Sequence, residues 1–187
     1  MLHYWNESWA LDVKVCPCDA HFVEFLEDRG IRGASIFHFG TGSHHLVGIR
    51  TAESGRDNAV LGITASPGEY QSYVELAIAR PEVTRTYKAF FGDIYQLDAR
   101  LLPDFDVVTL FHLCEFRTEK NDAYGALGDL AMASLLVDRM KPGGWLLFYT
   151  GSMAYDRAKP VIERLQQIRP LEAAGTFKTL RLLRKRA

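Results

Sequence analysis

The chain has 187 residues, 48% of them hydrophobic, and its 22 Lys and Arg nearly balance 23 Asp and Glu. This length suits a single domain over residues 1–187 and leaves no room for a separate substrate domain of standard size. A formal charge of -1 gives no reason to expect a nucleic-acid or membrane-surface partner. The three cysteines are too few for a disulfide scaffold, and no basic N-terminal region precedes an apolar run, so we expect a cytoplasmic protein.

Short apolar runs predict the strands of a parallel sheet. Each run is nearly continuous rather than alternating, as in strands that are buried on both faces. The runs are Ser35 to Phe39, Ala59 to Ile63, Tyr87 to Phe91, Asp106 to Phe111 and Trp145 to Tyr149. Helices must therefore cover both faces of the sheet.

Longer amphipathic segments between these runs predict the helices. We expect them over about residues 19–29, from Ser66 onward, over about 123–140 and over about 156–167. Ser66 and Glu69 have the spacing of a capping box, with Pro67 at the first helical position. At the end of the chain, residues 171–174 and 177–184 flank Gly175 and predict a short hairpin.

Alternation of strands and helices with right-handed crossovers predicts an α/β fold. We expect a Rossmann-like, doubly wound and mostly parallel sheet with an antiparallel edge strand and helices on both faces. Ligands of such sheets bind at the carboxyl ends of the strands. The first of these ends is followed by Gly40-Thr41-Gly42, where glycines let backbone amides approach a ligand. A tight turn without a ligand is the alternative interpretation, because the third glycine of a dinucleotide fingerprint is absent.

Several motifs follow one another in a fixed order over about residues 30–150. They are Phe37 to Gly42, Leu61 to Pro67, Gly92 to Ile94, Phe105 to Val108 with His112 to Glu115, and Lys141 to Trp145. In order and spacing they resemble the motifs of class I S-adenosylmethionine-dependent methyltransferases. The resemblance implies S-adenosylmethionine as cofactor and a small molecule as methyl acceptor.

The resemblance also implies positions for the cofactor. The amides around Gly40 to Gly42 would face its methionine end, and Asp93 would accept from the adenine amino group beside Ile94. The complete set of expected cofactor-binding residues is Gly40, Thr41, Gly42, Thr64, Ala65, Asp93, Ile94, Phe111 and His112.

His112 and Glu115 are the expected catalytic residues. A histidine at the carboxyl end of a strand is well placed to take the proton that most methyl acceptors lose. Glu115 lies three residues later and, on a helical turn, would share a face with His112 and orient the imidazole. Alternatively, the His-x-x-Glu stretch serves cofactor packing or loop structure.

Three positions depart from the family's pattern. The family usually has an acid where this chain has His38, a third glycine where it has His44, and a ribose-binding acid where it has Thr64. A threonine cannot offer the paired, charge-assisted contacts of a carboxylate. Two functions therefore stand: methyl transfer from S-adenosylmethionine to a small molecule, or a methyltransferase-like binding or assembly protein that has lost the cofactor.

Two groups of side chains invite a metal interpretation. One comprises His38, His44, His45 and His112, and the other comprises Cys16, Cys18 and His21. Neither group has the spacing of a known zinc motif, so we expect no metal.

The N-terminal segment is rich in aromatic residues. It includes Tyr4, Trp5 and Trp9, and residues 1–18 are a possible lid over the site. An aromatic strap over the sheet edge is the alternative.

Overall fold

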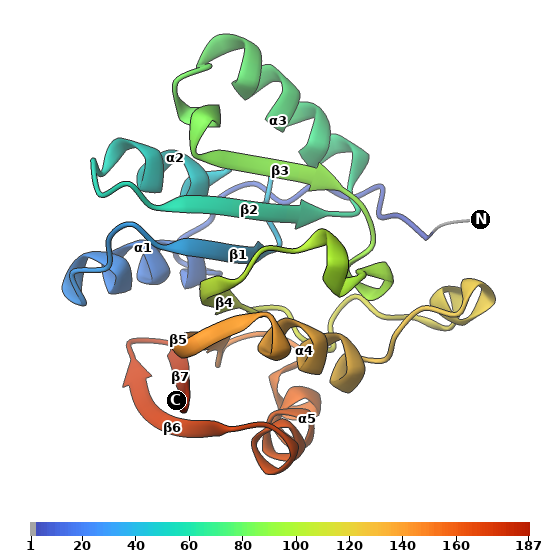
Figure 1. The fold of residues 1–187 in the computed structure, drawn as a ribbon. Helices are drawn as coiled ribbons and strands as arrows, with labels where there is room; N and C mark the ends of the chain where they lie inside the picture. Colours follow the sequence, from blue (N-terminus) through green and yellow to red (C-terminus); the bar gives the residue numbers. More distant parts are fainter. Residues whose placement is uncertain (1–2) are drawn as a thin grey trace.

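The computed structural model describes residues 3–187 and contains a seven-stranded sheet in the order β3-β2-β1-β4-β5-β7-β6 (Figure 1). The strands are β1 (Ser35–Phe39), β2 (Ala59–Thr64), β3 (Tyr87–Phe91), β4 (Phe105–Thr109), β5 (Met140–Tyr149), β6 (Leu171–Phe177) and β7 (Leu180–Lys185). Strands β1 to β5 pair in parallel, whereas β7 is antiparallel to both β5 and β6. The expected mostly parallel sheet is confirmed, with the reversed strand beside the edge strand β6.

Helices cover both faces of the sheet. They are α1 (Cys18–Asp28), α2 (Leu46–Glu53), α3 (Pro67–Ala79), α4 (Asp129–Asp138) and α5 (Tyr155–Ile168). Short 3-10 helices lie at η1 (Val83–Arg85), η2 (Ile94–Gln96), η3 (Ala99–Leu101) and η4 (Glu119–Tyr124). Buried side chains of α1, α2 and α3 share one hydrophobic cluster, and those of α4 and α5 share the other. The sheet is therefore covered by helices on both sides.

Two sequence-based boundaries are wrong. The helix expected over 123–140 is replaced by η4 and the shorter α4, because Gly125 adopts a left-handed φ of 67° and ends η4. The fifth strand was expected from Trp145, but β5 begins at Met140 and includes residues 141–144. Gly144 is required there, since an added Cβ would lie 2.9 Å from the Lys141 carbonyl oxygen.

The terminal hairpin is confirmed, although its turn is displaced. The chain reverses between Phe177 and Leu180, which pair with each other, and Gly175 instead lies in an irregular part of β6. In addition, the bounds of α2 were not predicted from the sequence.

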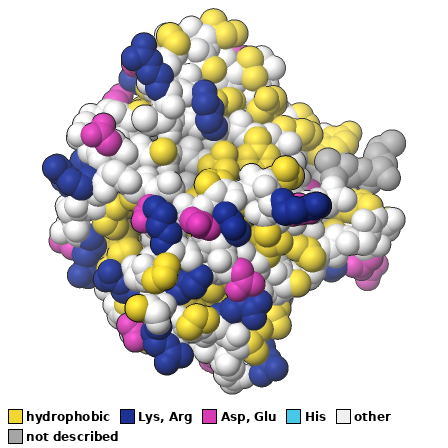
Figure 2. All heavy atoms as spheres, viewed as in Figure 1, with side chains coloured by type: hydrophobic (Ala, Val, Ile, Leu, Met, Phe, Trp, Pro, Cys, Tyr) yellow, Lys and Arg dark blue, Asp and Glu magenta, His cyan; other side chains and the backbone are white. Residues whose placement is uncertain are grey.

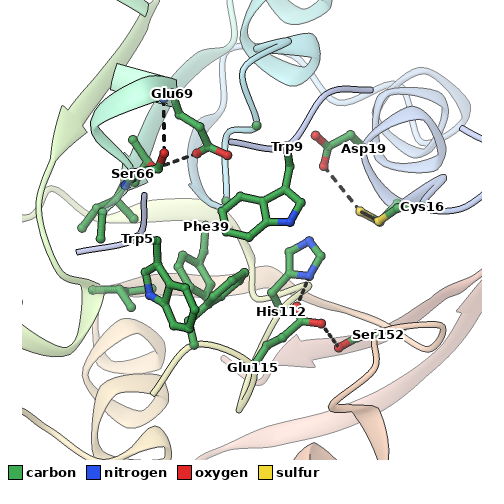
Figure 3. A pocket seen from close by; sticks show the side chains of 18 of the residues that line it. Trp5, Trp9, Cys16, Asp19, Phe39, Ser66, Glu69, His112, Glu115 and Ser152 are labelled. Carbon is green, nitrogen blue, oxygen red and sulfur yellow. Dashed lines mark hydrogen bonds and ion pairs between the residues drawn. The ribbon is translucent and has the colours of Figure 1, made fainter. Parts of the chain in front are cut away.

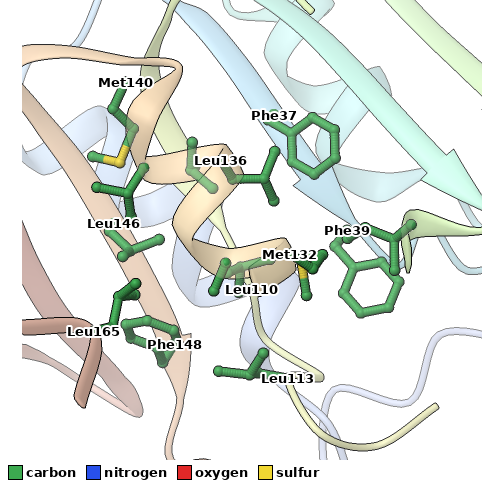
Figure 4. Packing of buried hydrophobic residues seen from close by; sticks show 14 of the residues in the cluster. Phe37, Phe39, Leu110, Leu113, Met132, Leu136, Met140, Leu146, Phe148 and Leu165 are labelled. Carbon is green, nitrogen blue, oxygen red and sulfur yellow. The ribbon is translucent and has the colours of Figure 1, made fainter. Parts of the chain in front are cut away.

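The larger hydrophobic cluster lies between the sheet and α4 (Figure 4). Met132 and Leu136 of α4 are fully buried beside Phe37 of β1 and Leu146 of β5. Truncation of such a leucine to alanine typically costs about 2–5 kcal/mol. This core holds β1 and β4 in fixed register, so the residues that follow both strands are positioned by the sheet.

The surface carries charges of both signs. On the face shown in Figure 2, basic and acidic side chains are interspersed. Several are paired, including Arg139 with Asp104 at 2.9 Å and Arg169 with Asp138 at 2.7 Å. Among residues 3–187, no helix combines the length and the apolar character that a membrane crossing requires.

Candidate functional site

A cavity of about 520 Å³ opens at the carboxyl ends of β1 to β4. Its volume lies in the range of small-molecule sites. Of the residues expected to bind a cofactor, the cavity is lined by Gly40, Gly42, Thr64, Ala65, Asp93, Ile94 and His112. The cavity is also lined by Trp5 and Trp9, which belong to the N-terminal segment considered as a lid, and by residues that the sequence did not assign to the site, namely Asp19, Glu69, Phe116 and Asn121.

Two of the residues expected to bind the cofactor, Phe111 and Thr41, do not line the cavity. Phe111 is buried against Phe22, with ring centroids 5.8 Å apart, and does not line the cavity. Thr41 is also buried, and its hydroxyl points to Glu69. Phe111 follows the last residue of β4 by two positions, so its side chain falls on the core side of the turn.

The glycine turn after β1 requires its glycines. Gly40 and Gly42 have φ of +86° and +56°, in the region that favours glycine. A Cβ at Gly42 would lie 2.3 Å from Nε2 of His44, so the His44 imidazole packs directly over this glycine. Nδ1 of His44 accepts a hydrogen bond from the Leu46 amide at 3.1 Å and thereby satisfies the first free amide of α2. His44 thus occupies the face that the third glycine would have left open.

A buried carboxylate lies at the end of β2. Oε2 of Glu69 accepts from the Thr64 hydroxyl at 2.6 Å and from the Thr41 hydroxyl at 3.3 Å. The expected reciprocal capping box is not formed: Ser66 caps the Glu69 amide, but the Ser66 amide donates to Thr64 instead of to Glu69. This frees the Glu69 carboxylate to line the cavity, and burial raises the pKa of Glu69 despite the hydrogen bond from Thr64.

Asp93 is hydrogen bonded to two residues of η4. Its Oδ1 accepts from the Tyr95 amide at 2.9 Å, and its Oδ2 accepts from Asn121 Nδ2 at 2.8 Å and from the Tyr124 hydroxyl. A carboxylate has about four lone-pair sites, so one further donor can still be accepted. Asp93 therefore links the end of β3 to η4 and still faces the cavity.

His112 and Glu115 are in direct contact. Nδ1 of His112 is hydrogen bonded to Oε2 of Glu115, and Oε1 of Glu115 lies 3.5 Å from the Ser152 hydroxyl (Figure 3). The two side chains therefore meet, but not on the helical turn that was expected, since Cys114 between them has a left-handed φ of 66°. The bond occupies Nδ1 and leaves Nε2 of the imidazole as the nitrogen available to another group.

Two thiols lie beside this histidine. Sγ of Cys16 and Sγ of Cys18 are 3.4 Å apart, and both approach the His112 ring. The hydrogen bond with Cys18 lowers the pKa of Cys16 more than burial raises it, with His112 contributing in the same direction. Burial lowers the pKa of His112, but its interactions with Cys16 and Glu115 outweigh this and raise that pKa to about 10.

The other three histidines of the group considered from the sequence do not converge with His112 on one point. His38 is buried with Nδ1 2.8 Å from the Thr109 hydroxyl, and His45 contacts the Tyr87 hydroxyl through Nδ1. Nε2 of His44 lies 3.8 Å from the Asp19 carboxylate. Among the described residues, the donor atoms that lie close enough to share a metal include His112 but not His38, His44 or His45.

Residues 3–17, termed here the N-terminal strap, run along the cavity. The Trp5 amide donates to the Ala65 carbonyl at 3.0 Å, and the Ser43 amide donates to the Trp9 carbonyl at 2.9 Å. The two indoles pack edge-on against Phe116, each with ring centroids 5.3 Å apart. Figure 3 shows Trp9 projecting between the part of the cavity that holds Glu69 and the part that holds His112.

Comparison with known proteins establishes the fold. No protein-family model matches the chain, and no curated protein matches it. Among solved structures, a precorrin-6y C5,15-methyltransferase from Geobacter metallireducens is 13% identical over 99% of this chain and 100% of that one, with a TM-score of 0.63. A putative O-methyltransferase from Klebsiella pneumoniae is 15% identical over 92% of this chain and 82% of that one, with a TM-score of 0.57.

A third neighbour has a different activity. The [4+2]-cyclase SpnF is 18% identical over 92% of this chain, with a TM-score of 0.60, and this chain spans 65% of its length. At such identities the likeness concerns the fold. The class I methyltransferase fold expected from the sequence is confirmed, and the cyclase is an instance of the general rule that a fold does not fix a reaction.

Proposed function

We propose that the cavity binds S-adenosylmethionine and that the protein transfers its methyl group to a small-molecule acceptor. The observation that carries the proposal is the convergence of three polar features on one cavity. The Gly40 to Gly42 turn, the Thr64–Glu69 pair and Asp93 follow β1, β2 and β3, respectively. Along the edge of the sheet, the backbone amides of the glycine turn are thus followed by the Glu69 carboxylate and then by the Asp93 carboxylate. This order suits an extended ligand that carries an amino acid at one end and a nucleoside at the other.

Glu69 supplies the acid that the end of β2 lacks. We assign its carboxylate to the ribose hydroxyls, with Thr64 positioning it through the 2.6 Å hydrogen bond. Asp93 accepts a hydrogen bond from the adenine amino group, Ile94 lies beside the adenine ring, and Ala65 lies next to the ribose. The methionine end faces Gly40 and Gly42, with Thr41 positioning Glu69 from behind. Phe111 supports His112 from the core and does not contact the cofactor.

The chemistry of the reaction belongs mainly to the cofactor. S-adenosylmethionine supplies the electrophilic methyl group, and the protein aligns the acceptor with it and excludes water. Trp5 and Trp9 of the N-terminal strap provide apolar cover over the cavity. His112, through Nε2, accepts the proton of the acceptor, and Glu115 positions the ring and stabilises its cation.

The three free thiols, Cys16, Cys18 and Cys114, support a cytoplasmic location for this reaction. The acceptor is assigned to a small molecule because the cavity is bounded by the N-terminal strap.

Methyl transfer is tested with S-adenosylmethionine carrying an isotope-labelled methyl group and a panel of small hydroxyl, amine and thiol compounds. Formation of a labelled product together with S-adenosylhomocysteine supports the proposal. Binding of the cofactor without turnover of any compound favours the binding or assembly protein.

A further inference from the structure

We propose that Cys16, Cys18 and His112 form a zinc site at the wall of the cavity. The donor atoms of these three side chains all lie within 4.8 Å of one another. Zinc–sulfur bonds are about 2.3 Å, so two thiolates on one tetrahedral zinc lie about 3.8 Å apart. The observed 3.4 Å between the two sulfur atoms is close to that spacing.

The fold brings these ligands together from two distant parts of the chain. Cys16 lies near the end of the N-terminal strap, Pro17 occupies the N-cap position of α1, and Cys18 is the first residue of that helix. His112 comes from the turn after β4. The sequence suggested His21 as a partner of the cysteines, but in the structure His21 contacts Thr179 at 2.8 Å, and His112 takes its place.

The partner of His112 strengthens the case. Histidines that bind metals almost always donate the other ring N–H to a carboxylate or carbonyl, which fixes the tautomer and the ring orientation. Glu115 makes this contact with Nδ1, which leaves Nε2 for the metal, and Ser152 in turn contacts Glu115. Two thiolates and one imidazole favour zinc over magnesium or calcium, which prefer oxygen ligands.

Three protein ligands leave one position of a tetrahedral zinc for a further ligand. Cys16, Cys18 and His112 all line the cavity, so this position faces the space assigned to the acceptor. When zinc binds, it replaces the thiol protons and any proton on Nε2, which pass to solvent. His112 is then a ligand and no longer a base, and the zinc itself lowers the pKa of a bound hydroxyl or thiol. This last step, which assigns the acceptor to the hydroxyls or thiols, rests on the proposed function.

The test uses the full chain, reduced and stripped of metal with a chelator, then titrated anaerobically with Co²⁺ as a spectroscopic substitute for zinc. We expect one Co²⁺ per chain, thiolate-to-cobalt charge transfer in the near ultraviolet and intense visible bands of tetrahedral cobalt. One equivalent of Zn²⁺ should abolish these bands. No cofactor is present, so the result does not depend on methyl transfer.

Variants separate this site from other metal binding. Cys16→Ser and Cys18→Ser should each lower the charge-transfer absorbance per bound cobalt, because one of the two thiolates is lost, and weaken binding at least about a hundredfold. Glu115→Gln should weaken binding about 10–100-fold. Cys114→Ser and His21→Ala are the matched controls and should bind as the wild type does. Circular dichroism of each metal-free variant verifies folding.

Three outcomes would overturn the zinc site. They are absence of stoichiometric binding, equal binding by Cys16→Ser and the wild type, and a Cys16–Cys18 disulfide that persists under the reducing conditions used. A monothiol such as mercaptoethanol, added to the cobalt form, should shift the charge-transfer band if the fourth position is open. An unchanged spectrum would contradict the open position.

Discussion

The Thr64 hydroxyl donates a 2.6 Å hydrogen bond to the Glu69 carboxylate, and both side chains are buried. The acid at the end of β2 is therefore supplied from the first turn of α3, five residues later in the chain. Since Thr41 donates to the same oxygen, the carboxylate also connects this site to the glycine turn.

Glu69→Gln tests this assignment. The substitution keeps the shape but removes the charge, and we expect binding of S-adenosylhomocysteine to weaken about 10–100-fold, as for loss of a charge-assisted contact of about 1.5–3 kcal/mol. Calorimetry measures the affinity. Glu75→Gln, on the exposed side of α3, is the control and should bind normally. Equal affinity in Glu69→Gln and the wild type would contradict the ribose role of Glu69.

Thr64→Asp distinguishes the structural interpretation from the family pattern. By the pattern alone, an acid at position 64 restores a ribose ligand and tightens binding. In the structure it would lie against the Glu69 carboxylate, and two close carboxylates cannot both ionise without penalty. We therefore expect a lower melting temperature and weaker binding of S-adenosylhomocysteine. Tighter binding at unchanged stability would favour the pattern.

His44→Gly should open the glycine turn. The imidazole packs over Gly42 on the face assigned to the methionine end, so its removal should tighten S-adenosylhomocysteine binding by up to about tenfold. The same change removes the cap of the Leu46 amide and should destabilise the fold by about 0.5–2 kcal/mol. His44→Asn, with a smaller side chain that retains an acceptor, should lose less stability. If affinity falls in both variants, the imidazole is part of the binding surface.

The buried His45 predicts a loss of stability in acid. Burial lowers the pKa of His45 from 6.5 to about 4, so the ring is neutral in the folded protein. A histidine whose pKa is lowered by folding contributes stability above pH 6.5, and this contribution is lost as the pH falls toward 4. Asparagine tolerates the left-handed φ of 48° at this position, so His45→Asn is a suitable variant. Between pH 6.5 and pH 4, its unfolding free energy should decline by roughly 2–3 kcal/mol less than that of the wild type. Denaturant titrations at several pH values measure both slopes; parallel slopes would contradict the prediction.

The raised pKa of His112 predicts the pH dependence of methyl transfer by the metal-free protein. The base must be unprotonated, and the pKa of His112 is raised to about 10, so kcat/KM should increase as the pH rises from neutrality toward that value. His112→Ala should slow turnover about a hundredfold or more with cofactor affinity nearly unchanged. Glu115→Gln should move the rising limb to lower pH. A pH-independent rate would show that His112 takes no proton.

The sheet could be predicted from the sequence because most of its strands correspond to short, nearly continuous apolar runs of consecutive residues. The bounds of helix α2 were not predicted, because it is only eight residues long and starts after the left-handed His45. The break before α4 depends on the conformation of Gly125, which the apolar periodicity of the segment does not reveal.

The site was less predictable because its contacts join distant residues. The contact of His112 with Glu115 could be expected from the sequence, since the two residues are three positions apart. Glu69 was recognised only as a member of a capping box, because its partner Thr41 comes from another strand end. The approach of Cys16 to His112 depends on the path of the N-terminal strap, which no periodic pattern encodes.

Calorimetry of the purified protein with S-adenosylhomocysteine tests the central claim, that this cavity is a cofactor site, most directly. The account predicts one binding site per chain, with affinity reduced in Glu69→Gln and retained in Glu75→Gln. Absence of binding at about millimolar ligand, which limits the binding free energy to roughly 4 kcal/mol, would contradict the account and favour a methyltransferase-like binding or assembly protein.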